Sequence, residues 1–397
     1  MADSTPTTLG TVCELTKGTY PTEKTPPGPY PLIVTAELPR TSDSFQLDGE
    51  AVCIPIISST GHGHASLKRV HYARGKIAVA NLLVAAQPRP GAPVDARWLW
   101  LYLNHRKDSL IVPLMRGTAN VSLKPAQLAE IPLDLPSLAQ QRRIVDLIGA
   151  VDGLIAAAEV TADSYTRTER EIVSHEWHEM RADETPVASL AGTAFGRGFR
   201  DGDWIESKDQ SPRTDDAVRL IQLADIGVGE FLDRSDRWIA PSTFQRLRCT
   251  AVLPGDLLIC RMADPAGRTA RIPARTYRMV TAVDCTIVRL DPEIADSDYW
   301  LAMLNSPDWL SAVDRLSTGS TRRRITRRNL ERIRVPVVAL DRQIGVGALL
   351  AAAADAAASA RNVARVLTSL RRTVLADLLS GEHEIPASYD RFLDGAA

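Results

Sequence analysis

The longest regular pattern in the chain is an alternation of apolar and polar positions between residues 138 and 180. Apolar or small residues recur at spacings of three and four, as at the a and d positions of a coiled coil. These residues are Ile144, Leu147, Val151, Leu154, Ala158, Thr161, Tyr165, Thr168 and Ile172. The pattern predicts one long helix that packs against a partner helix along these positions.

The same seam occurs a second time, 202 residues further along the chain. Its members are Leu349, Ala353, Ala356, Ala360, Val363, Leu367, Leu370 and Val374. The correspondence continues upstream at the same offset, where Trp98 matches Trp300 and Gln141 matches Gln343. Chance similarity between two alanine-rich helices would not extend through this non-helical sequence without a gap. One long offset therefore indicates two copies of a domain-sized unit.

The repeat divides the chain into four segments and a tail. We predict a globular part at 1–137, a long helix at 138–182, a second globular part at 183–339, a second long helix at 340–381 and a tail at 382–397. Short β-branched runs alternate with short helical stretches in both globular parts, so each is expected to be an α/β domain. The whole chain is therefore expected to be α+β.

Composition and charge are typical of a globular protein with more than one domain. The 397 residues are 45% hydrophobic, and the net charge is −1, so any basic surface must be local. Five widely spaced cysteines without a C-x-x-C pair indicate reduced thiols in a cytoplasm. No run approaches the roughly 18 apolar residues of a membrane span, and no apolar signal-peptide segment begins the sequence. We therefore expect a cytoplasmic protein without a membrane span.

The strongest local signal for binding is a cluster of arginines between residues 322 and 334. It follows a Gly-Ser-Thr loop and spans a predicted helix N-terminus, a setting that suits phosphate oxygens. No acidic residue interrupts it before Glu331, which favours DNA contact over a solvated charged face. Its members are Arg322, Arg323, Arg324, Arg327, Arg328, Arg332 and Arg334.

Two Gly-rich loops, at 58–69 and 261–271, occupy corresponding places in the two copies. Their small residues allow close backbone approach, and their polar side chains can reach base edges, although hairpin connections of purely structural role are an alternative. The candidates for DNA contact in the loops are Ser59, Thr60, His62, His64, Lys68, Arg69, Arg261, Arg268 and Arg271. Lys17 and Arg197, which precede matching glycines near the start of each copy, complete the set.

Motifs of known enzyme classes are missing from the sequence. Neither the N/D-P-P-Y/F signature of amino-methyltransferases nor a G-x-x-x-x-G-K-[ST] phosphate loop occurs. Glu206-Ser207-Lys208 resembles the end of a nuclease E-x-K motif but has no acidic partner at a convincing spacing. His175 and His178 lack a third ligand and are expected to be a helix-surface pair. We therefore expect no catalytic residue and no metal in this chain.

With these features the chain resembles the specificity subunit of a type I restriction-modification system. That family consists of a target recognition domain, a conserved helix, a second recognition domain and a second conserved helix. The most specific resemblance lies at the exit of each recognition domain. Residues 117–144 resemble the family pattern of Gly, a short helix, an Ile-x-x-strand, Pro-x-x-x-x-Gln and the long helix. Residues 319–344 follow it up to Pro336 but have Val337 and Val338 where proline is usual.

The resemblance implies an architecture and a mechanism. Two long helices, packed antiparallel as a coiled coil, would separate two recognition domains related by a pseudo-two-fold internal repeat. Each domain would read one half of a split double-stranded DNA target, and the helices would set the spacer. Two methyltransferase subunits would dock on the chain and supply S-adenosylmethionine and catalysis, and nuclease-translocase subunits would complete the complex. No cofactor is expected in this chain itself.

Three other interpretations remain open. The chain could be a DNA-binding specificity module of a different defence complex, an enzyme with an unrecognised site, or a helical scaffold for assembly. The arginine cluster and the two distinct loop sets favour DNA binding over a purely structural role.

Overall fold

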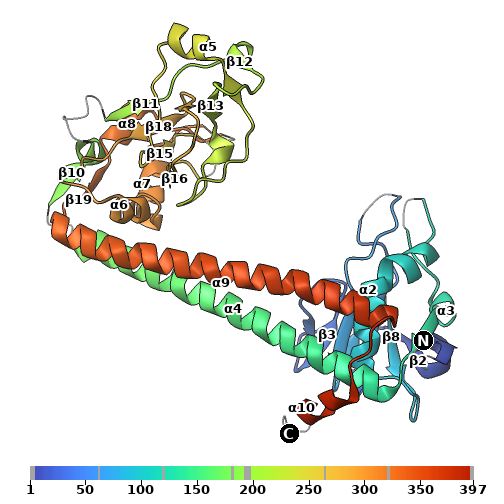
Figure 1. Ribbon diagram of the computed structural model, residues 1–397. Helices are drawn as coiled ribbons and strands as arrows, with labels where there is room; N and C mark the ends of the chain where they lie inside the picture. The colour runs from blue at the N-terminus through green and yellow to red at the C-terminus, as the bar shows by residue number, and fades with distance from the viewer. Residues whose placement is uncertain are drawn as a thin grey trace. The chain divides into compact units, whose positions relative to one another are not determined.

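The chain folds into two compact units that each combine a globular part with segments of two long helices. The computed structural model describes residues 5–60, 63–118, 121–179, 183–191, 198–262, 265–319 and 322–393. Unit 1 consists of Met1–Ala157 with Val363–Ala397, and unit 2 consists of Ala158–Asn362. The long helices are α4, Leu138–Glu179, and α9, Leu340–Ser380, both close to the predicted bounds (Figure 1).

The core of unit 1 is an antiparallel sheet in the order β2-β8-β5-β6. These strands are β2 (Cys13–Lys17), β8 (Leu83–Pro88), β5 (Glu50–Pro55) and β6 (His71–Arg74). A smaller sheet has the order β4-β3-β7, in which β3 and β7 are parallel. Its strands are β4 (Arg40–Ser42), β3 (Tyr30–Ile33) and β7 (Ala78–Val79). The apolar run over 77–86 is therefore divided between two strands that belong to different sheets.

Unit 2 repeats this topology with one additional strand. Its central sheet has the order β11-β18-β15-β16, and its second sheet the order β12-β14-β13-β17 with β13 parallel to β17. The central strands are β11 (Phe199–Asp201), β18 (Cys285–Val288), β15 (Leu257–Cys260) and β16 (Thr269–Arg271). The others are β12 (Gln210–Ser211), β14 (Trp238–Ile239), β13 (Val218–Ile221) and β17 (Met279–Thr281). The extra strand β12 has no counterpart in unit 1 among the described residues.

Short elements complete each unit, and some of them correspond between the two copies. In unit 1 they are β1 (Thr5–Thr8), α1 (Leu9–Val12), α2 (Ala96–Leu110), η1 (Val112–Leu114), α3 (Pro125–Leu128), β9 (Pro132–Leu135), η6 (Ala387–Tyr389) and α10 (Asp390–Leu393). In unit 2 they are β10 (Glu184–Pro186), η2 (Val187–Leu190), η4 (Ser207–Asp209), η5 (Leu223–Asp225), α5 (Pro241–Arg246), α6 (Ser297–Met303), α7 (Pro307–Leu316), α8 (Arg327–Glu331) and β19 (Arg334–Pro336). β1 pairs with β9 as β10 pairs with β19.

The repeated glutamine joins each long helix to its globular part by the same hydrogen bonds. Gln141 accepts from the Asp95 amide at 2.7 Å and donates to the carbonyls of Pro93 and Pro136. Gln343 accepts from the Asp296 amide at 3.0 Å and donates to the carbonyls of Ile294 and Val338. Val338 can replace the usual proline because only its carbonyl is used. Its departure from the family pattern leaves this connection intact.

Replacing Gln141 by alanine should lower the stability of unit 1 by about 1–3 kcal/mol, because it leaves buried backbone groups without partners. Hydrogen exchange of α2, whose first residue follows Asp95, measures the effect. Arg142→Ala is the matched control, since Arg142 is exposed on the same helix. Equal protection of α2 in the two variants would contradict this role for Gln141.

The helix seam lies one position away from the predicted one over much of its length. In unit 2 the buried positions are Ala162, Val173, Leu350 and Ala357, whereas Thr161 and Leu349 are exposed. In unit 1, Ile148 and Leu375 are buried, and Leu154 is 58% exposed. In unit 2 the two helical segments run antiparallel, as the contacts Glu176–Arg342 and Thr166–Arg361 show. In unit 1, Asp152 of α4 pairs with Arg371 of α9. Small alanines line the contact because they allow close approach, and this displaces the larger side chains outward.

The expectation on membrane spans needs a correction for α9. An 18-residue window of this helix has a mean hydropathy of 1.3, enough to cross a membrane by length and composition alone, and 22% of the window is buried. Its hydropathy comes mainly from alanine. Because Leu350 and Ala357 pack within unit 2, the apolar composition has a role in helix packing.

Candidate nucleic-acid interface

In unit 1 the Gly-rich loop connects β5 to β6 and is stabilised by its own hydroxyl groups. Ser58 donates to the His64 carbonyl at 2.6 Å, and the Ser59 hydroxyl accepts from the Lys68 amide at 3.0 Å. Thr60 and Ser66 share a 2.9 Å hydrogen bond. The hydroxyls predicted to contact DNA thus hold the loop in shape while Ser59 and Thr60 remain exposed.

The cations of unit 1 differ in their availability. His64 and Lys68 are exposed, whereas Arg69 is half-buried and pairs with Glu37 at 2.7 Å. Lys17 lies at the same end of the sheet as the loop. Val84 of β8 pairs on one side with Lys17 of β2 and on the other with Ile54, close to the end of β5 from which the loop leaves. His62 lies outside the described residues. Among the described residues of the loop, His64 and Lys68 are therefore the freest basic groups.

In unit 2 the Gly-rich loop connects the equivalent strands β15 and β16, but its arginines face the protein. Arg261 is buried, pairs with Asp201 at 3.0 Å and donates to the Ile325 carbonyl. Burial lowers the pKa of Arg261, and Asp201 partly offsets that effect. The guanidinium of Arg261 is enclosed by protein groups, which gives it a structural role, and DNA contact by Arg261 stays a prediction.

Arg268 and Arg271 are also used by the fold. Arg268 donates to the carbonyls of Ile226 and Leu223 at 2.8 and 2.9 Å, which gives this half-buried side chain a structural role, and DNA contact by Arg268 stays a prediction. Arg271 pairs with Asp298 at 2.5 Å. It is only half-buried, so DNA contact by Arg271 stays a prediction. Arg197 lies outside the described residues.

The arginine cluster begins beside this loop. Arg324 forms an isolated β-bridge with Met262, and the Ile325 amide donates to the Arg261 carbonyl at 2.9 Å. In unit 1 the matching bridge joins Ile57 to Ser122. The structure therefore places each Gly-rich loop beside the segment that, in unit 2, carries the arginine cluster.

Several arginines of the cluster have acidic partners, most of which lie outside the local sequence. Arg323 pairs with Asp314 at 2.5 Å and Arg324 with Asp284 at 2.9 Å. Arg327 pairs with Glu331 and lies 3.7 Å from Asp201. These pairs are partly exposed and therefore weak, so phosphate oxygens can compete for the guanidinium groups.

Arg322 and Arg328 are the most available members of the cluster. Both are exposed, and neither forms an ion pair with another described residue. The other two members, Arg332 and Arg334, line a pocket of about 580 Å³ together with Trp177. The seven arginines thus divide between two parts of the surface.

Replacing Arg322 and Arg328 by alanine should weaken DNA binding equally for all sequences. If each contacts one phosphate, the salt dependence of log K should fall in slope by about 1.8. The slope is measured from the binding of full-length protein to one fixed duplex over a series of salt concentrations. The double variant Arg323→Ala and Arg324→Ala, whose side chains already have partners, should change the slope less. A larger change of slope in the Arg323→Ala and Arg324→Ala variant than in the Arg322→Ala and Arg328→Ala variant would assign the phosphate contacts to the paired arginines.

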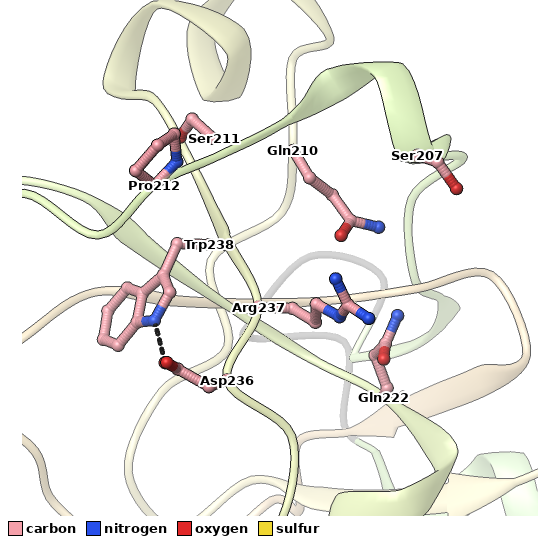
Figure 2. A pocket seen from close by; sticks show the side chains of 8 residues that line it. All are labelled: Ser207, Gln210, Ser211, Pro212, Gln222, Asp236, Arg237 and Trp238. Carbon is pink, nitrogen blue, oxygen red and sulfur yellow. Dashed lines mark hydrogen bonds between the residues drawn. The ribbon is translucent and has the colours of Figure 1, made fainter.

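A pocket that the sequence did not indicate lies in the second sheet of unit 2. It has a volume of about 420 Å³, and Gln210, Gln222 and Arg237 project into it (Figure 2). Gln210 lies in β12, Gln222 directly follows β13, and Arg237 directly precedes β14. No sequence signal marks them, because they are single polar residues beside very short strands.

The sites considered for catalysis and metals have structural explanations. Lys208 pairs with Glu206 at 2.5 Å, and His178 lies 3.4 Å from Asp308. Within the described ranges, no three His, Cys, Asp or Glu side chains come together in a group that could hold a metal ion.

Comparison with known proteins gives a family match for the first copy and fold matches for the whole chain. Residues 1–161 match the family model of the type I restriction modification DNA specificity domain. No curated protein matches the chain. The type I restriction-modification S subunit from M. genitalium is 14% identical, with a TM-score of 0.62 over 95% of this chain and 96% of that one.

A second solved structure, described as the basis of complex assembly and conformational transition of the type I R-M system, is also similar. It is 17% identical, with a TM-score of 0.54 over 95% of this chain and 97% of that one. At these identities the structures establish a shared fold. Residues 1–161 are therefore similar to the type I restriction modification DNA specificity domain, and the chain as a whole shares the fold of these solved structures.

Proposed function

We propose that this chain is the specificity subunit of a type I restriction-modification complex and that each unit reads one half of a bipartite DNA target. One observation supports this most directly: the topology of the DNA specificity domain in unit 1 recurs in unit 2 with different residues at the loops. Two domains of one fold with different surfaces suit a target with two unequal halves.

The long helices are proposed to set the spacer and to dock two methyltransferase subunits. Exposed apolar side chains support docking, because Val363, Val366 and Leu370 lie on one side of α9 in unit 1, each about half exposed. In unit 2, Val160 and Leu349 are similarly exposed. Apolar surface of this kind is typical of a protein interface.

The division of labour follows from this assignment. The chain contributes specificity, while the methyltransferase subunits bind S-adenosylmethionine and carry out catalysis. Nuclease-translocase subunits would join the same assembly for restriction. Its substrate is genomic or phage DNA, which places the complex in the cytoplasm and gives it a role in phage defence.

Long-read methylation sequencing tests the proposed function. A host expressing this chain with its adjacent methyltransferase is compared with a host expressing the methyltransferase alone. The expected result is a new methylated motif of two short half-sites with a fixed spacer. A purified complex with the methyltransferase that yields no motif would contradict the proposal.

A further inference from the structure

The pocket in unit 2 is formed by three neighbouring segments of one sheet. Gln210 of β12 pairs with Ile239 of β14, and Val218 of β13 pairs with the same residue. Arg237 directly precedes β14, and its carbonyl accepts from the Leu220 amide at 2.8 Å. The polar side chains are therefore held on a hydrogen-bonded sheet, a more precise support than a free loop.

The acidic groups around the pocket are engaged by other residues. Asp236 accepts from the Trp238 indole and points away from Arg237 (Figure 2). Asp209 pairs with Arg246 at 2.5 Å, and Glu206 pairs with Lys208. Arg237 itself is exposed and forms no ion pair with any described residue. The pocket thus presents a guanidinium group that forms no ion pair with a described carboxylate.

The chemistry of the lining fits base edges better than phosphates. A guanidinium group can donate two hydrogen bonds to guanine O6 and N7, and a glutamine amide can donate and accept at adenine N6 and N7. A site for phosphate alone would gather cations, whereas two neutral amides flank Arg237 here.

We infer that Gln210, Gln222 and Arg237 form a base-reading site of the second recognition domain, in which Arg237 reads a guanine and the glutamines read adenine. This inference rests on the proposed function. Because β12 has no described counterpart in unit 1, the site serves only the half-target that unit 2 reads.

Selection from a randomised double-stranded DNA library by the full chain tests the site. Wild type should select a motif with two half-sites. Arg237→Ala should lower the preference for one base pair of one half-site by roughly 10- to 100-fold and leave the other half-site unchanged. Arg237→Lys keeps the charge but loses the bidentate fork, so it should also lose the base preference while retaining total affinity.

The glutamine variants and a matched control complete the test. Gln210→Ala and Gln222→Ala should each relax a neighbouring position of the same half-site. Arg234→Ala should leave the motif intact, because Arg234 is exposed three residues away and does not line the pocket. Uniform weakening across all sequences in Arg237→Ala, or an unchanged motif in all variants, would overturn the inference. A wild-type chain that selects no motif would instead overturn the proposed function.

Discussion

Replacing Trp300 by alanine should lower the stability of unit 2 by about 3–5 kcal/mol, the usual effect of truncating a buried tryptophan. Trp300 is 1% exposed and lies in the hydrophobic core formed by α6, α7 and the central sheet. Its indole also donates to Gln343 at 2.8 Å, so the variant removes one hydrogen bond of the glutamine that joins α9 to the domain. The loss therefore combines a cavity with a weakened connection to the helix.

Hydrogen exchange of the strands is the appropriate measurement, because a chain of two units need not unfold in one step. Peptides of β15 and β18 should lose protection, while those of β5 and β8 in unit 1 provide an internal reference. Trp204→Ala is the control, because Trp204 is 69% exposed and should change stability by less than about 0.5 kcal/mol. Similar losses in both variants would show that Trp300 does not support the core.

The long helices and the repeat could be predicted because both leave strong local patterns. Helical periodicity sustained over about 40 residues marks a helix whatever it packs against. The offset from Gln141 to Gln343 identified two residues that make the same set of contacts. The loops from β5 and β15 also occupy equivalent places, as their positions in the two copies predicted.

The phase of the helix seam could not be predicted from residue size. Leu154 and Tyr165 suggest an apolar stripe, but both are exposed, and Ala162 and Ala357 are buried instead. Periodicity locates a stripe to within about one position, and neighbouring stripes on α9 are almost all alanine. Which stripe is buried depends on how closely the two backbones approach, and this is a tertiary property.

The roles of individual arginines were the least predictable part of the candidate site. The cluster seemed free of acids in the sequence, yet Asp314 and Asp284 reach it from other elements. Arg261 was a loop candidate but is buried by the segment that contains Ile325. Charge along the chain does not reveal which partner the fold supplies.

Replacing Arg219 by methionine should destabilise the second sheet of unit 2 by about 3–5 kcal/mol, because it leaves a buried carboxylate without its cation. Arg219 is 2% exposed and donates to Asp225, which is fully buried, and to Asp233 at 3.0 Å. Asp225 in turn accepts from the Gln222 amide at 2.7 Å. The ion pair therefore also fixes the segment that carries one wall of the base-reading pocket.

A double-mutant cycle separates the ion pair from simple loss of packing. Methionine keeps the aliphatic stem of Arg219, and Asp225→Asn in the same chain removes the stranded charge, so the double variant should recover part of the lost stability. Hydrogen exchange of β13 and β17 measures the recovery, with Arg234→Met as the exposed control. If the double variant is no more stable than Arg219→Met, the buried charge is not the cause. The loss would then come from the other contacts of Arg219, such as its donation to the Arg237 carbonyl beside the pocket.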